Sequence, residues 1–72
     1  MVHFFKTNIH CVNCIKAVRG FLSEVPSVEN WDVDTDNQQK ILKVSGDSVD
    51  KEEVINAVRE AGFDIDWIKM ED

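Results

Sequence analysis

Apolar residues first follow a strand-like pattern along this sequence and then recur with the spacing of a helix. The order of these two patterns constrains the fold more than any other feature. Residues 2 to 9 are apolar and β-prone, with Phe5, Thr7 and Ile9 on one face, and this pattern predicts a strand without selecting its inward face. Residues 12 to 24 instead repeat apolar side chains every three or four positions. That spacing is typical of an amphipathic helix, so a strand followed by a helix is predicted.

The chain then returns to strand patterns. Residues 28 to 35 and residues 40 to 45 alternate apolar and polar side chains, and the polar residues 36 to 39 lie between them. Two alternating runs joined by a short polar stretch predict a hairpin. A last alternating run over residues 63 to 68 predicts a fourth strand.

A second helix is predicted between the hairpin and the last strand. Asp50 followed by Glu53 is an acidic variant of the capping box, and Val49 with Val54 can form the hydrophobic staple around it. Gly62 falls where a left-handed C-terminal cap belongs.

The order strand, helix, strand, strand, helix, strand predicts an α+β, ferredoxin-like βαββαβ fold. In this arrangement both helices cover one face of a four-stranded antiparallel sheet. We expect residues 1 to 72 to form a single domain, because a chain of 72 residues has room for only one modest core. The loops after the first strand and before the last strand then lie at the same end of the sheet. Cys11 and Phe63 are therefore predicted to be neighbours.

Charge and hydropathy exclude several classes of function. Eight basic and 14 acidic residues give a formal charge of −6, which disfavours binding to nucleic acid or to anionic lipid. No run approaches the roughly 20 apolar residues of a membrane span, so no membrane insertion is predicted. The residues at the start, 1 to 6, lack a basic segment followed by an apolar signal core. The chain is predicted to be soluble and cytoplasmic.

Cys11 and Cys14 are the only cysteines, and they lie where the first strand pattern gives way to the helix pattern. A pair so close in sequence would close too small a loop to staple a fold. Thiolates bind Cu(I) and Zn(II), and a helix N-terminus lowers a thiol pKa toward the thiolate form. The pair therefore predicts a soft-metal site or a redox site.

The alternatives to a metal site are a thiol-disulfide redox module and an interaction domain with incidental cysteines. A thioredoxin-like fold needs about 100 residues and a cis-proline beside its cysteines. Pro26, the only proline, instead closes the first helix. Metal ligation is therefore the preferred interpretation.

The two histidines are interpreted differently. His10 could supply a third ligand, since imidazole suits Zn(II) and Cu(II). Adjacent residues in an extended loop point opposite ways, so we expect His10 to point away while Cys11 points inward. His3 is interpreted as a strand residue near the chain end without a role.

These elements together resemble the heavy-metal-associated domain family of small copper chaperones and of N-terminal domains of metal-pumping ATPases. The resemblance covers essentially the whole chain and is carried by residues 9 to 14 and residues 60 to 63. It implies that Cys11 and Cys14 are the metal ligands, that Ile9 anchors the loop from below, and that Phe63 lies over the site.

The chain departs from the family pattern at two positions. Asn8 stands where the family has Gly, and His10 stands where Thr or Ser is common. Because Asn is the non-glycine residue that best tolerates positive φ, Asn8 is expected to keep the bend of the loop.

The resemblance implies a metal-binding and transfer protein that is not an enzyme. Cu(I) is the expected ion, because two thiolates suffice for near-linear Cu(I), and Zn(II), which prefers four ligands, ranks second. The expected partner is a metal-transporting ATPase or another metal-binding domain, bound transiently. The chain itself is expected to be a monomer or a metal-bridged dimer.

Overall fold

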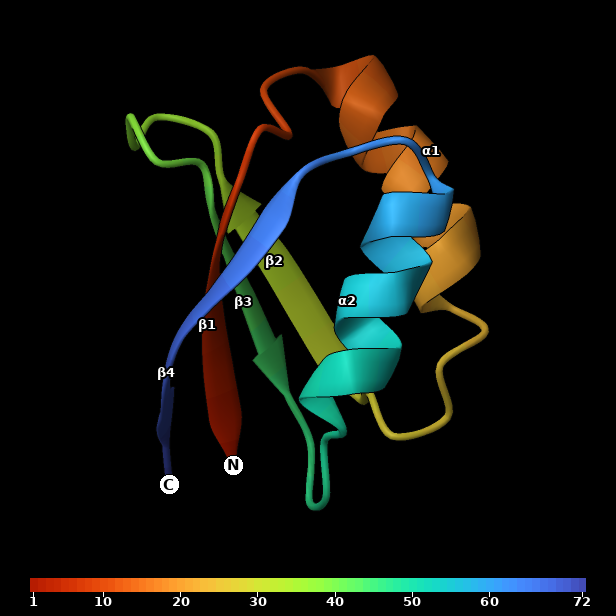
Figure 1. Ribbon diagram of the computed structural model, residues 1–72, viewed down its shortest axis with the longest axis vertical. Helices are drawn as coiled ribbons and strands as arrows, with labels where there is room; N and C mark the ends of the chain where they lie inside the picture. Colours follow the sequence, from red (N-terminus) through yellow and green to blue (C-terminus); the bar gives the residue numbers. More distant parts are fainter.

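The computed structural model describes residues 1–72 as one sheet covered by two helices. The elements follow in the order β1 (Val2–Thr7), α1 (Val12–Leu22), β2 (Asn30–Asp34), β3 (Ile41–Ser45), α2 (Lys51–Glu60) and β4 (Ile65–Glu71). The strand order is β2-β3-β1-β4, with every neighbouring pair antiparallel. Both helices lie on the same face of this sheet (Figure 1). The predicted α+β, ferredoxin-like arrangement is therefore confirmed.

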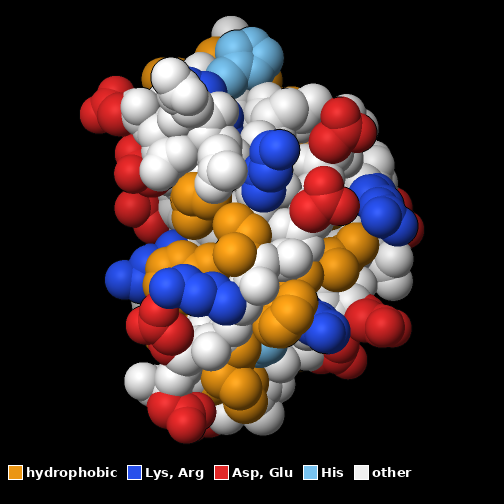
Figure 2. Space-filling view, turned by 60° about the vertical axis from the view of Figure 1, so that its left-hand side comes forward, with side chains coloured by type: hydrophobic (Ala, Val, Ile, Leu, Met, Phe, Trp, Pro, Cys, Tyr) orange, Lys and Arg blue, Asp and Glu red, His pale blue; other side chains and the backbone are white.

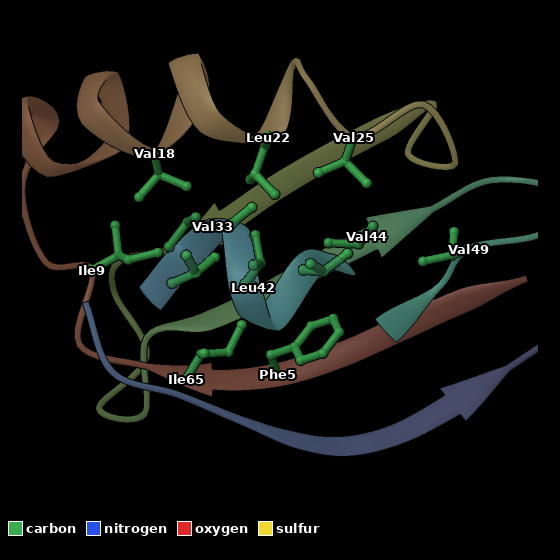
Figure 3. Close-up of a cluster of buried hydrophobic side chains, with 13 residues drawn as sticks. Phe5, Ile9, Val18, Leu22, Val25, Val33, Leu42, Val44, Val49 and Ile65 are labelled. Carbon is green, nitrogen blue, oxygen red and sulfur yellow. The ribbon is translucent and has the colours of Figure 1, made fainter. Parts of the chain in front are cut away.

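The inward face of β1 is the one that carries His3, Phe5 and Thr7, which are all buried. Side chains of the sheet and the helices meet between the two layers, and Ile9 from the loop after β1 joins them (Figure 3). The core draws on all six elements and consists of Phe5, Ile9, Val18, Leu22, Val25, Val33, Leu42, Val44, Val49, Val54, Ala57, Val58 and Ile65.

The start of α2 confirms Asp50 as the N-cap residue, but not the reciprocal bonds with Glu53 that the predicted capping box requires. The Asp50 side chain accepts a hydrogen bond from the backbone N–H of Glu52 at 3.0 Å and so caps the helix. The predicted return bond from Glu53 is wrong, because the backbone N–H of Asp50 donates to Ser27 Oγ at 3.2 Å. The segment after α1 thus takes the place of the second half of the box.

The end of α2 has the predicted glycine cap. Gly62 has a φ of 94°, and its N–H donates to the carbonyl of Arg59 at 2.9 Å. The N–H of Phe63 reaches back to the carbonyl of Val58 at 3.2 Å. These two bonds form a Schellman motif, which turns the chain from α2 toward β4.

The chain termini and the cysteine loop lie at opposite ends of the sheet. The chain termini lie side by side at one end, and the loop between β1 and α1 lies at the other, with the α2–β4 junction (Figure 1). Neither helix is long and apolar enough to cross a membrane.

Candidate metal centre

Hydrogen bonds of Thr7 and burial of Ile9 hold the loop between β1 and α1 in place. The Thr7 hydroxyl accepts a hydrogen bond from the N–H of Ile9 at 3.2 Å and donates to the carbonyl of Lys40. These bonds end β1 at Thr7, so the strand is shorter than the predicted residues 2 to 9. The Ile9 side chain is fully buried in the core, which matches the anchoring position that the family resemblance implies for it.

Cys11 is the N-cap residue of α1. Its backbone is extended, with φ −144° and ψ 166°, and its Sγ accepts the backbone N–H of Cys14 at 3.3 Å. The carbonyl of Cys11 accepts the N–H of Ile15 at 3.0 Å. Because sulfur replaces the usual capping oxygen, the start of the helix itself orients the Cys11 side chain.

The two thiols are in contact at the surface. Their sulfur atoms lie 2.8 Å apart, and both cysteines are free and half-buried. Residues separated by three positions in the first turn of a helix point to the same side, which brings the Cys14 sulfur to the Cys11 sulfur. An incoming ion or partner thiol can reach both atoms.

The hydrogen bond between the thiols separates their pKa values. It lowers the pKa of the Cys11 thiol, and the backbone N–H of Cys14 lowers that pKa further. The same contact raises the pKa of the Cys14 thiol, and desolvation acts in the same direction. Cys11 is therefore the first to become a thiolate, with the Cys14 thiol donating to it.

His10 lies beside the cysteine pair. One of its ring nitrogens and the two sulfur atoms all lie within 4.8 Å of one another, and the side chain is exposed. The expectation that His10 points away from the thiols is therefore wrong. The loop turns into α1 directly after His10, so the alternation of an extended strand does not apply there.

Asn8 does not have the conformation that we expected. Lys40 is the only non-glycine residue with positive φ, so Asn8 does not reproduce the backbone of a glycine. Its side chain instead accepts the backbone N–H of Asp64 at 2.9 Å and donates to the Asp64 carboxylate at 3.4 Å. No local pattern predicts this contact, because the two residues are 56 positions apart.

The contact between Asn8 and Asp64 joins the cysteine loop to the α2–β4 junction. Phe63, directly before Asp64, packs against the core and remains partly exposed. The two loops are therefore adjacent at one end of the sheet, as the topology predicted. A position of Phe63 over the sulfur atoms themselves stays a prediction.

Fold and loop define a small βαββαβ domain with a half-buried CxxC dithiol at its surface. The family model of the heavy-metal-associated domain matches residues 3–64. The chain therefore belongs to the heavy-metal-associated domain family, as its sequence indicated. Among curated protein sequences, none matches this chain.

Solved structures of similar shape include domains of metal-handling proteins. The N-terminal domain of PacS from Synechocystis PCC6803 is 18% identical, with 96% of this chain and 98% of that chain covered and a TM-score of 0.79. The N-terminal domain of ZntA in its Zn(II) form is also 18% identical, with coverage of 99% and 96% and a TM-score of 0.82. The CopZ metallochaperone is 22% identical, with coverage of 90% and 98% and a TM-score of 0.78. At these identities the likeness establishes the fold.

Proposed function

We propose that this chain binds a soft metal ion between Cys11 and Cys14 and transfers it to another protein. Cu(I) is the preferred cargo and Zn(II) the second. The observation that carries the proposal is the contact of two half-exposed thiols, 2.8 Å apart, on a loop that is fixed by Thr7, Ile9 and the cap of α1. CopZ, a metallochaperone, and ZntA in its Zn(II) form have the same fold.

The chemistry of the site suits transfer by ligand exchange. Each thiol gives up its proton as its sulfur binds the ion, and Cys11 is the more acidic of the two. Two thiolates satisfy near-linear Cu(I), which leaves room for a partner thiolate to join as a third ligand. One original bond then breaks, and the ion moves without release into water. No oxidation is involved, and the ion is cargo, so the proposed role is not enzymatic.

The proposed partner is a metal-transporting ATPase or a separate metal-binding domain. Exchange requires both sites to come within bonding distance, so the exposed end of the sheet that holds Cys11 and Cys14 must be the docking surface. Such an encounter is transient and fits an interface below about 1,200 Å². A cytoplasmic, monomeric carrier is the form that we propose.

Titration of the reduced apo protein with Cu(I), Zn(II) and Cd(II) tests this function. We expect tight binding of one Cu(I) per chain, with loss of that binding in Cys11→Ser and in Cys14→Ser. Serine keeps a capping oxygen at position 11, so the fold should survive, as circular dichroism can verify. Val12→Ser is the matched control, because Val12 lies between the cysteines and is 68% exposed. Retention of a Kd below about 1 µM for Cu(I) in the double serine variant would refute the dithiolate site.

A redox module is the second candidate, since the same contact between the sulfur atoms and the lowered pKa of Cys11 also suit disulfide exchange. Measuring both glutathione exchange and metal affinity distinguishes the two functions. A redox module would exchange readily with a glutathione buffer while binding Cu(I) and Zn(II) only weakly. A carrier would bind tightly, and its bound ion would protect both thiols from oxidation.

A further inference from the structure

We infer that His10 is a third ligand for a divalent ion through its Nε2 atom, and that Asn8, held by Asp64, is the residue that positions the imidazole. This inference rests on the proposed function and deepens it, because it names the side chain that raises the Zn(II) affinity of a site otherwise suited to Cu(I).

The donor atoms of His10, Cys11 and Cys14 lie close together. A His10 ring nitrogen and both cysteine sulfur atoms lie within 4.8 Å of one another. In a tetrahedral zinc site the ion lies about 2.3 Å from sulfur and about 2.0 Å from nitrogen, which puts ligand atoms roughly 3.5 to 3.8 Å apart. The sulfur atoms, at 2.8 Å, must open by about 1 Å, and the imidazole must approach by a similar amount. Side-chain rotation covers both movements, because His10 is exposed and the cysteines are half-exposed.

A hydrogen bond to Asn8 determines which nitrogen of the His10 imidazole carries the proton. His10 Nδ1 lies 2.9 Å from the backbone carbonyl oxygen of Asn8. A carbonyl oxygen can only accept, so Nδ1 carries the hydrogen of the neutral ring. The lone pair is then on Nε2, which is the atom left for an ion. Metal-binding histidines commonly donate their second N–H to a carbonyl in this way, which fixes the tautomer and the ring orientation.

The side chain of Asn8 holds this carbonyl in place through its contacts with Asp64. The Asn8 side chain accepts the N–H of Asp64 at 2.9 Å and donates to its carboxylate at 3.4 Å. These contacts extend the pairing of β1 with β4 beyond its last pair, Thr7 with Ile65. Asn8 therefore faces two ways, with its side chain tied to the α2–β4 junction and its carbonyl holding the imidazole.

This arrangement discriminates between ions. Zn(II) prefers four ligands, and two thiolates, His10 and a water molecule would supply them. Cu(I) is satisfied by the two thiolates and gains little from the imidazole. The arrangement of Asn8 and His10 should therefore raise the affinity for Zn(II) and leave the affinity for Cu(I) nearly unchanged.

The test measures Zn(II) and Cu(I) affinities of the wild type, His10→Ala and Asn8→Gly, with ¹⁵N NMR of the His10 ring. We expect His10→Ala to weaken Zn(II) by about 10- to 100-fold, with Cu(I) within about threefold. Asn8→Gly keeps the carbonyl and removes the side-chain contacts. It should weaken Zn(II) by roughly tenfold and reduce the Nδ1–H tautomer in the metal-free protein. Asn13→Ala is the matched control, because Asn13 is an exposed asparagine of the same segment without these contacts.

Each outcome separates the inference from the function on which it rests. A wild type that binds neither ion refutes both. Tight binding by the wild type with Zn(II) affinity unchanged in His10→Ala refutes the third ligand alone. Loss of Zn(II) affinity in His10→Ala, with Asn8→Gly matching Asn13→Ala in affinity and ring spectrum, refutes the positioning role of Asn8.

Discussion

His3 is a buried titratable residue on the inner face of β1, at the end of the sheet away from the cysteines. It is 7% exposed, its Nδ1 accepts the Nε1–H of Trp67 at 2.9 Å, and its Nε2 has no hydrogen-bond partner. Burial lowers the pKa of His3, and the positive charges of Lys51 and the chain N-terminus lower it further, against a smaller opposing effect of the Val49 backbone. The lowered pKa favours the neutral form of His3, whose Nδ1 can accept the hydrogen bond of Trp67.

The lowered pKa of His3 predicts a loss of stability at mildly acidic pH. The unfolded chain has a histidine pKa of about 6.5, so it binds the proton before the folded chain does. The contribution of neutral His3 is present above that pH and is lost as the pH falls toward the folded pKa. Protonated Nδ1 also cannot accept the hydrogen bond of Trp67.

Urea unfolding between about pH 7.5 and pH 5.5, above the range where carboxylates titrate, measures this effect. We expect the free energy of unfolding to fall with pH in the wild type and in His10→Ala, and to vary much less in His3→Gln. An identical pH slope in His3→Gln and the wild type would assign the effect to other groups.

At the scale of elements, α2 depends on caps at both ends. Asp50 accepts an N–H at its start, and the helix also begins with Glu52 and Glu53, whose charges suit the positive end of the helix dipole. Gly62 closes its other end. Since Val54 and Val58 of this helix are fully buried, the order of α2 determines how the sheet is covered.

Removal of the N-cap should destabilise the domain without changing the metal site. We expect Asp50→Ala to lower the free energy of unfolding by about 1 kcal/mol, and Asp50→Asn, which keeps an acceptor, to cost less. Asp47→Ala is the matched control, because Asp47 is exposed in the preceding loop and only its backbone N–H is bonded. Denaturant unfolding monitors the three variants. Equal values for Asp50→Ala and Asp47→Ala would show that the cap contributes nothing to stability.

At the scale of the whole molecule, the formal charge is −6, but the surface carries both basic and acidic side chains. Figure 2 shows Lys and Arg side chains among Asp and Glu on the side of the sheet that includes β4, around exposed hydrophobic groups. Near the cysteine loop, Asp64 and Asp66 border a hollow of about 380 Å³ that Lys6 and Arg59 also line, and Lys6 lies opposite Asp66 in the register of β1 and β4. The acidic rim next to the site is therefore partly neutralised.

Even so, we predict that this rim steers a partner with a basic surface. Charges at the edge of an interface act mainly on the rate of encounter, so Cu(I) transfer should slow with added salt while the exchange equilibrium barely moves. Asp64→Lys with Asp66→Lys should slow transfer at low salt. The control, Asp47→Lys with Asp72→Lys, reverses two charges at the other end of the sheet.

Both double variants change the formal charge by +4, from −6 to −2, so they match in net charge and differ in where the charge lies. Asp64→Lys also removes the carboxylate contact with Asn8, so the Cu(I) affinity of both variants is measured beside the transfer rate. Stopped-flow transfer of Cu(I) to a metal-binding domain with a basic rim, at low and high salt, provides the measurement. Equal low-salt rates for the two variants would place Asp64 and Asp66 outside the docking surface.

Much of the fold and the position of the dithiol follow from signals that act over a few residues. The alternation of strands, the three-to-four spacing of helices, the Asp50 cap and the Gly62 turn each depend on neighbours within about one turn or one pleat, and these were predicted. The same holds for Cys11 and Cys14, because a residue pair at the start of a helix shares one side whatever surrounds it.

The contacts that tune the site and the core could not be predicted in this way, because they depend on the register of strands far apart in sequence. Asn8 meets Asp64 across 56 positions, and His3 meets Trp67 across 64. The irregularity between Phe4 and Phe5 sets Trp67 opposite Phe5, and a shift of one residue would turn its ring to the other face. The spacing of apolar residues does not determine this register. It is determined by side-chain packing when β1 and β4 pair.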